Sequence, residues 1–147
     1  MPDNAQIARQ MMEELNNQGK LELIDQNYDP GYRGHETLNP DVGREQLKKN
    51  IQMYRTAFPD LSLKVDEVAA AGDKVLLRWT VRGTHKGPFL GTPPTGKPFK
   101  TQGITVYTFR NAKILEEWTQ WDALGLIRDL GIGQQIPQLR GPAAPRP

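Results

Sequence analysis

The chain has 147 residues, with 19 Lys and Arg against 17 Asp and Glu, and it contains no cysteine. This length predicts one domain, large enough to bury a core without disulfides. The absence of cysteine excludes disulfides, thiolate metal sites and cysteine nucleophiles. The charges are scattered without a run of one sign, so nothing in them favours a nucleic-acid partner.

Targeting and metal-binding signals are also missing from the sequence. Residues Met1 to Asn4 do not begin a basic and then apolar signal segment, and no run of about 18 apolar residues occurs. We therefore expect a soluble, cytoplasmic protein with no membrane partner. The two histidines, His35 and His85, lie in no metal-ligand spacing, so no metal site is expected.

Helices are predicted where apolar residues recur every three or four positions. The first runs from Ala5 to Asn17, and Leu21 to Ile24 suggests one further helical turn. Tyr32 to Asp41 is expected to be a loop. A second long helix is predicted from Gly43 to Phe58, and a short one from Ala123 to Leu130, before a glycine.

Strands are predicted in the second half of the chain, where β-branched and aromatic residues alternate with polar ones. Three candidates are Leu61 to Ala70, Lys74 to His85 and Lys100 to Arg110, and a fourth runs from Ile114 to Asp122. The last two are close enough to form a hairpin. The loop from Lys86 to Pro98 is rich in Gly and Pro, and its Phe89 either covers a cavity or anchors the loop on the core.

Helices followed by antiparallel strands indicate an α+β fold in which the helices lie on one face of a curved sheet. Such a sheet encloses a cone, and residues on its inner face line a pocket. We expect residues 1–133 to form this single domain. Residues 134–147 are rich in proline and poor in apolar side chains, so we expect a mobile tail.

Asp122 is the first candidate for acid/base chemistry, because it ends a strand beside an aromatic residue. Strict alternation places Ile114, Glu116, Trp118 and Asp122 on one face of this strand. If that face lines a cavity, burial raises the pKa of the Asp122 carboxyl toward neutral pH, as a general base requires. The alternative is that Asp122 only caps the helix that follows it.

Five sequence motifs in order resemble the SnoaL-like polyketide cyclase (ester cyclase) family, within the nuclear-transport-factor-2-like superfamily of cone-shaped folds. The resemblance covers about Ala5 to Gly131. The motifs are Phe58-Pro59-Asp60-Leu61, Gly72-Asp73-Lys74-Val75, the segment from Arg82 to Phe89 with Pro94 to Lys97, the segment from Phe109 to Trp118, and the segment from Asp122 to Gly131. The resemblance implies a cofactor-free cyclase that uses Asp122 as acid/base, with His35 helping to hold the substrate.

Further residues are candidates for the pocket wall, although core packing would explain each of them as well. His35 could equally be a surface histidine bonded to its neighbours, and we expect His85 to be structural or exposed. Arg78 would need a carboxylate such as Glu116 if it were buried. The predicted substrate-binding set is Trp118, Gln102, Tyr32, Phe89, Met53, Trp79 and Arg78.

The first functional hypothesis is an enzyme that removes a proton next to a carbonyl and forms a carbon–carbon bond in a hydrophobic, polyketide-like molecule. The second is water addition or elimination in the same pocket, as in epoxide hydrolases and dehydratases of this shape. The third is a non-catalytic module that binds a small hydrophobic ligand. A homodimer is also expected, through an outer sheet face assigned to Leu115, Thr119 and Trp121.

Overall fold

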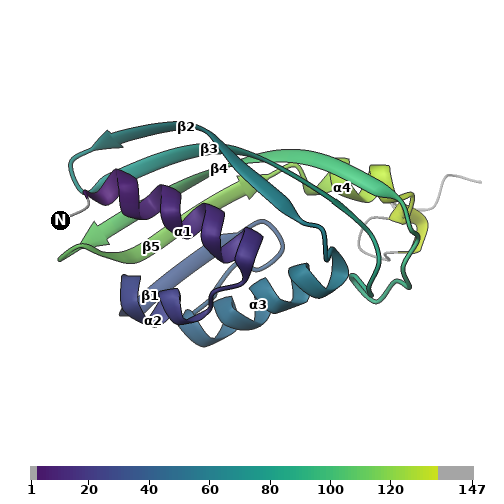
Figure 1. Ribbon diagram of the computed structural model, residues 1–147, viewed down its shortest axis with the longest axis horizontal. Coiled ribbons are helices and arrows are strands. Elements are labelled where there is room, and N and C mark those ends of the chain that lie inside the picture. Colours follow the sequence, from purple (N-terminus) through teal and green to yellow (C-terminus); the bar gives the residue numbers. More distant parts are fainter. Residues whose placement is uncertain (1–2, 136–147) are drawn as a thin grey trace, which may run out of the picture.

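The computed structural model describes residues 3–135, in which a curved five-stranded sheet carries helices over one face (Figure 1). The elements are α1 (Asn4–Gln18), α2 (Glu22–Asn27), β1 (Tyr28–Glu36), α3 (Arg44–Ala57), β2 (Ser62–Ala71), β3 (Lys74–Thr84), β4 (Pro98–Arg110), β5 (Lys113–Trp121), α4 (Ala123–Leu130) and a 3₁₀ turn (Gly133–Gln135). The strand order is β1-β5-β4-β3-β2. The predicted α+β class, with helices on a curved and mostly antiparallel sheet, is confirmed.

Helix α1 begins and ends at the signals that its sequence provides. Asp3 accepts a hydrogen bond from the backbone N–H of Gln6, and the Gln6 side chain accepts one from Asp3 in return. Gly19 ends the helix in the left-handed conformation, at a φ of 65°. The helix buries Met11 and Leu15 against the sheet. Its bounds lie within one residue of the predicted range, Ala5 to Asn17.

Alternation along β3 and β4 separates a helix-covered inner face from an open outer face. On β3, Leu77 and Trp79 are buried, whereas Arg78 between them is exposed. On β4, Thr105 and Tyr107 face inward and Gln102 faces outward, which decides an orientation that the sequence leaves open. The inner face therefore supplies the core and the outer face remains uncovered within residues 3–135.

A bulge in β5 reverses the expected faces of this strand. Thr108 pairs with Glu116 and Phe109 pairs with Ile114, so Leu115 is an extra residue. The inward set beyond the bulge is Glu117, Thr119 and Trp121, and the outward set is Glu116, Trp118 and Gln120. The assignment of one continuous face from Ile114 to Asp122 is wrong, and so is the assignment of Thr119 and Trp121 to the outer face.

Strand β1 replaces the first half of the loop expected from Tyr32 to Asp41. It lies parallel to β5, with His35 opposite Trp118 and Glu36 opposite Thr119. The local sequence around Pro30, with its nearby glycines, favours a turn, yet proline is compatible with an edge strand. The hydrogen-bonding partner of this segment comes from the far end of the chain, which a local pattern does not report.

The remaining predictions concern connections and the C-terminus. The β4–β5 hairpin turns at Asn111 and Ala112, which both adopt positive φ angles of 52° and 62°. The predicted tail begins inside the 3₁₀ turn, and its residues 136–147 lie outside the described residues. Within residues 3–135, no helix is both long and apolar enough to cross a membrane.

Candidate functional site

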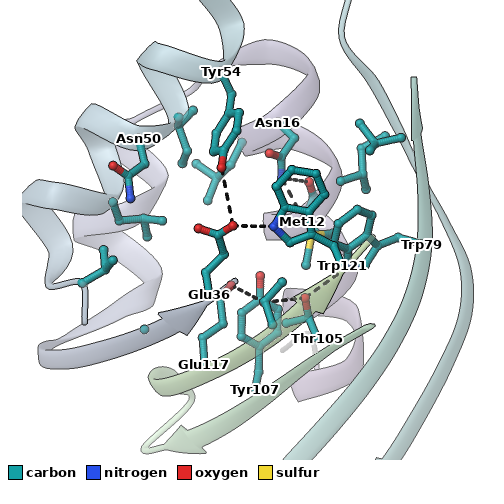
Figure 2. Close-up of a pocket in the computed structure, with 18 of the residues that line it drawn as sticks. Met12, Asn16, Glu36, Asn50, Tyr54, Trp79, Thr105, Tyr107, Glu117 and Trp121 are labelled. Atoms are coloured by element: carbon teal, nitrogen blue, oxygen red, sulfur yellow. Dashed lines mark hydrogen bonds between the residues drawn. The ribbon is translucent and has the colours of Figure 1, made fainter. Parts of the chain in front are cut away.

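A pocket lies between helices α1 and α3 and the inner face of the sheet (Figure 2). Its cavity volume is about 140 Å³. Among the described residues, eight aromatic side chains line it, including Tyr32, Tyr54, Trp79 and Trp121. An apolar, concave wall with a few polar groups is the usual setting of a small-molecule site.

Glu117 is a partly buried carboxylate that lines this pocket. Its Oε1 accepts a hydrogen bond of 2.8 Å from the Tyr32 hydroxyl, and its Oε2 accepts one of 2.7 Å from the Thr119 hydroxyl. Burial raises the pKa of the Glu117 carboxyl, the two hydrogen bonds oppose this effect, and the negative charge of Glu36 adds to it. A carboxyl of raised pKa can both accept and return a proton near neutral pH.

Three buried donors form a chain that leads to Glu117. The Thr119 hydroxyl hydrogen is used on Glu117, so the Thr105 hydroxyl must donate across the 2.8 Å that separates the two threonine oxygens. The indole N–H of Trp79 in turn donates to Thr105 Oγ1 at 3.1 Å. Each of these three hydrogen bonds is thus donated in the direction of Glu117. Together they orient its carboxylate and stabilise the charged form.

Gly34 allows the Tyr32 hydroxyl to reach this carboxylate. Gly34 lies opposite Glu117 in the parallel β1–β5 pairing. A Cβ atom at position 34 would stand 2.3 Å from the Tyr32 hydroxyl oxygen, closer than non-bonded atoms approach. The missing side chain therefore leaves room for the Tyr32 ring to cross β1.

Glu36, at the end of β1, is a second carboxylate in the same pocket (Figure 2). Its Oε1 accepts a short hydrogen bond from the Trp121 indole and a long one, 3.4 Å, from the Tyr54 hydroxyl. Its Oε2 accepts a bond of 2.7 Å from the Asn39 amide. These donors hold Glu36 near Glu117, and the two carboxylates interact electrostatically.

The pocket tyrosines remain hydroxyl donors over the whole range of physiological pH. Burial raises the pKa of Tyr32, Tyr54 and Tyr107, and the neighbouring carboxylates raise it further for Tyr32 and Tyr54. In the region that the structure describes, no three His, Cys, Asp or Glu side chains come together as a metal-binding group.

Asp122, the first sequence candidate, lies outside this pocket. It is exposed, and its Oδ1 accepts a hydrogen bond of 2.8 Å from the backbone N–H of Gly125. It is the N-cap of α4. The expectation that its carboxylate sits at the inner end of a cavity is wrong, because the bulge in β5 turns the other set of residues inward.

His35 and Trp118 meet on the outer side of the sheet. Their rings stack with centroids 4.0 Å apart, and Trp118 is 52% exposed. His35 contributes to the pocket wall, but its Nε2 contacts Glu116 Oε2 at 3.2 Å and its Nδ1 contacts the Pro40 carbonyl at 3.0 Å. Both ring nitrogens are thus engaged away from Glu117.

Only Tyr32 and Trp79 of the predicted substrate-binding set clearly line the pocket with their side chains. Arg78 is on the outer face and pairs with Asp66 and Glu67, not with Glu116. Phe89 anchors its loop, because it is buried against the rings of Phe58 and Tyr54. Not among the lining residues are Gln102, Met53, Phe89, Arg78, Trp118 and Asp122.

Sequence reasoning missed both pocket carboxylates. Glu117 lies two residues before Thr119 and four before Trp121, so alternation places it on the same face as these residues. From the sequence alone, that face was assigned to the outside of the sheet. The bulge decides which face of β5 points inward, and no local residue type predicts it. Glu36 was hidden because its strand was interpreted as a loop.

The chain matches the SnoaL-like polyketide cyclase family over residues 6–130. A candidate polyketide cyclase of known structure from Acidithiobacillus ferrooxidans is 30% identical, with a TM-score of 0.78, covering 89% of this chain and 96% of that one. IdmH, a candidate polyketide cyclase from Streptomyces antibioticus, is 28% identical, with a TM-score of 0.77 and coverage of 88% and 99%.

A neighbour described by a different activity is as similar to this chain as IdmH is. AclR, a candidate hydroxylase from Streptomyces galilaeus, is 28% identical with a TM-score of 0.77, covering 87% of this chain and 95% of that one. No curated protein is a significant match to the chain. Proteins described by different candidate activities therefore share this fold.

Proposed function

Because the chain belongs to the SnoaL-like polyketide cyclase family, we propose that it is a cofactor-independent acid/base enzyme acting on a hydrophobic carbonyl compound. The observation that carries this proposal is Glu117, a carboxylate of raised pKa that lines an aromatic pocket. General bases that work near neutral pH are tuned in this way.

The proposed reaction begins when ionised Glu117 removes a proton from the carbon next to the substrate carbonyl. The resulting enolate oxygen accepts a hydrogen bond from the Tyr54 hydroxyl, whose long contact with Glu36 is easily exchanged for a substrate contact. The enolate carbon attacks a second carbonyl of the same molecule, and Glu117 returns its proton to the new alkoxide. Protons and electrons balance within substrate and Glu117.

The structure favours Glu117 over Asp122 for this role. Glu117 is partly buried beside two hydroxyl donors, whereas Asp122 is exposed and engaged by the backbone of α4. The acid/base role of Asp122 that the family resemblance implies stays a prediction, and the experiment below includes it.

The test is hydrogen–deuterium exchange at the carbon next to the carbonyl of a small ring ketone such as cyclohexanone, followed by NMR in D₂O. We expect exchange catalysed by the wild type to fall by about 10²–10⁴ in Glu117→Gln, the usual worth of a positioned base. Glu116→Gln, one residue away on the outer face, is the matched control and should retain exchange. Retained exchange in Glu117→Gln would refute the assignment.

Water addition or elimination is the second candidate reaction, and the presence of two carboxylates in one pocket favours it. Glu36 could activate a water molecule while protonated Glu117 supplies a proton to the leaving oxygen. A binding module without catalysis is the third. If wild-type protein binds small ketones but exchanges none of their protons, the binding module replaces both enzymatic proposals.

We also propose a homodimer formed by the outer sheet face. Leu76, Ile104 and Trp118 are 45%, 49% and 52% exposed on neighbouring strands of this face. A second copy of the chain would remove these side chains from water. Light scattering should give a dimer for the wild type and a monomer for Ile104→Lys, and a monomeric wild type would contradict the proposal. A cytoplasmic location stays a prediction.

A further inference from the structure

The described residues that line the pocket include two carboxylates and no Lys or Arg. Glu36 and Glu117 face the cavity, and the one basic lining residue, His35, has its ring bonded to Glu116 on the outer side. The negative charge of Glu36 raises the pKa of both Glu117 and Tyr54, and the smaller effect of His35 on the pKa of Glu117 opposes it. The cavity therefore has a negative potential, which disfavours an anionic ligand.

The wall of the cavity also places two aromatic rings beside Glu36. The Trp121 indole and the Tyr54 phenol both contact this carboxylate, and their rings meet edge to face with centroids 6.3 Å apart (Figure 2). Aromatic faces attract cations through their quadrupole, most strongly in sites shielded from water. A carboxylate among aromatic rings is thus a combination that suits an organic cation.

The size of the cavity limits the ligand. Its volume of about 140 Å³ is close to that of an engineered apolar cavity of about 150 Å³ that holds benzene. A molecule built around a single ring fills such a space. A larger fused-ring compound would require the helices to move away from the sheet.

We propose that this pocket binds a ring-sized organic cation, in which a protonated amine pairs with Glu36 and the ring lies against Trp121 and Tyr54. The inference rests on the proposed function for its site and names the class of substrate that the site accepts. Glu36 is the anchor because its contact with the Tyr54 hydroxyl is long, 3.4 Å, and an ammonium N–H can take its place. Glu117 then remains available for proton transfer.

Three probes of similar size and different charge test this proposal: benzylamine, benzyl alcohol and benzoate. Binding is followed by NMR through the indole N–H signals of ¹⁵N-labelled protein. The Trp121 signal reports the pocket, because this indole donates to Glu36. The Trp118 signal is an internal control, because that indole lies on the outer face, half exposed.

We expect benzylamine to shift the Trp121 signal and to bind at least tenfold more tightly than benzyl alcohol, with benzoate weakest. Glu36→Gln should reduce the preference for the amine to about that of the alcohol while the alcohol still binds. Gln keeps the size of the side chain and an acceptor for Trp121, so a folded variant is expected. Its indole NMR spectrum verifies the fold.

The proposal is overturned if the alcohol or benzoate binds as tightly as the amine, or if the Trp118 signal moves instead of Trp121. It is also overturned if none of the three probes binds, because the cavity is large enough to hold a single ring of this size. None of the probes has a proton next to a ketone, so the result does not depend on turnover. Amine binding without ketone exchange would retain this ligand class and remove the proposed reaction.

Discussion

Strand β5 carries a glutamate and a tryptophan on each of its faces, and the two pairs have very different surroundings. On the inner face, Glu117 and Trp121 belong to a pocket closed by helices α1 and α3. On the outer face, Glu116 and Trp118 meet His35 beside solvent. The residue types are the same, so burial and hydrogen-bond donors, not composition, make the inner pair chemically distinctive.

Replacing the two tryptophans by alanine gives the largest expected contrast. Trp121→Ala removes a ring that packs on the core and a donor to Glu36, which should cost about 2–4 kcal/mol of unfolding free energy. Trp118→Ala should cost less than about 1 kcal/mol, because the ring is half exposed. Urea unfolding of both variants, each made in the monomeric Ile104→Lys background, measures the difference, and equal costs would contradict this expectation.

Removing one threonine hydroxyl on each side of the sheet compares the inner and outer faces. Thr119→Val removes a buried donor to Glu117 and leaves Thr105 without its acceptor, at an expected cost of about 1–3 kcal/mol. Thr108→Val removes only an outer-face contact with Lys74, at a cost of about 0.5 kcal/mol or less. Thermal or urea unfolding checks both, and a larger loss in Thr108→Val would contradict the proposed donor chain.

The pH dependence of stability tests the raised pKa of Glu117. The folded protein holds this proton at pH values where the unfolded chain, with an ordinary pKa near 4.5, has released it. The Glu117 contribution to stability is therefore greatest at low pH and is lost as the pH rises through the raised pKa.

The matched measurement compares unfolding free energies of the wild type and Glu117→Gln from acidic to neutral pH. The variant lacks this loss, so its stability relative to wild type should improve as the pH rises. Glu116→Gln should not show this relative improvement. If the difference between wild type and Glu117→Gln is flat with pH, the carboxyl is not shifted by burial.

The smallest expected effects concern Asp122. Asp122→Asn should change the unfolding free energy by only a few tenths of a kcal/mol, because Asn caps a helix about as well as Asp, whereas Asp122→Ala should cost about 1 kcal/mol. Ketone exchange by Asp122→Asn should equal that of the wild type. A fall of a hundredfold or more would return the acid/base role to Asp122.

Much of the fold follows from local sequence patterns. The helices at residues 4–18 and 44–57 and the three strands from residue 62 to 110 were predicted within a few residues, because capping, Pro and Gly signals and apolar periodicity agree there. Tyr32 and Trp79, two of the predicted substrate-binding residues, line the pocket, and their role there stays a prediction. These features depend on residues that are near neighbours in the chain.

The site itself depends on two features that local patterns do not contain. One extra residue, Leu115, exchanges the faces of β5 and brings Glu117 inward in place of Glu116. The parallel pairing of β1 with β5 turns an expected loop into a strand and brings Glu36 beside it. Residue types at the surface and in the pocket are alike, so only the register distinguishes them.

The pairing of β1 with β5 also has a consequence for the order of folding. Glu36 and Trp121, whose contact completes the pocket, are 85 residues apart in the chain. Strands β3, β4 and β5 pair with sequence neighbours, whereas β1 must close a long loop, a step with a higher entropic cost. In a refolding experiment, binding competence should therefore return in a later kinetic phase than the β-sheet signal.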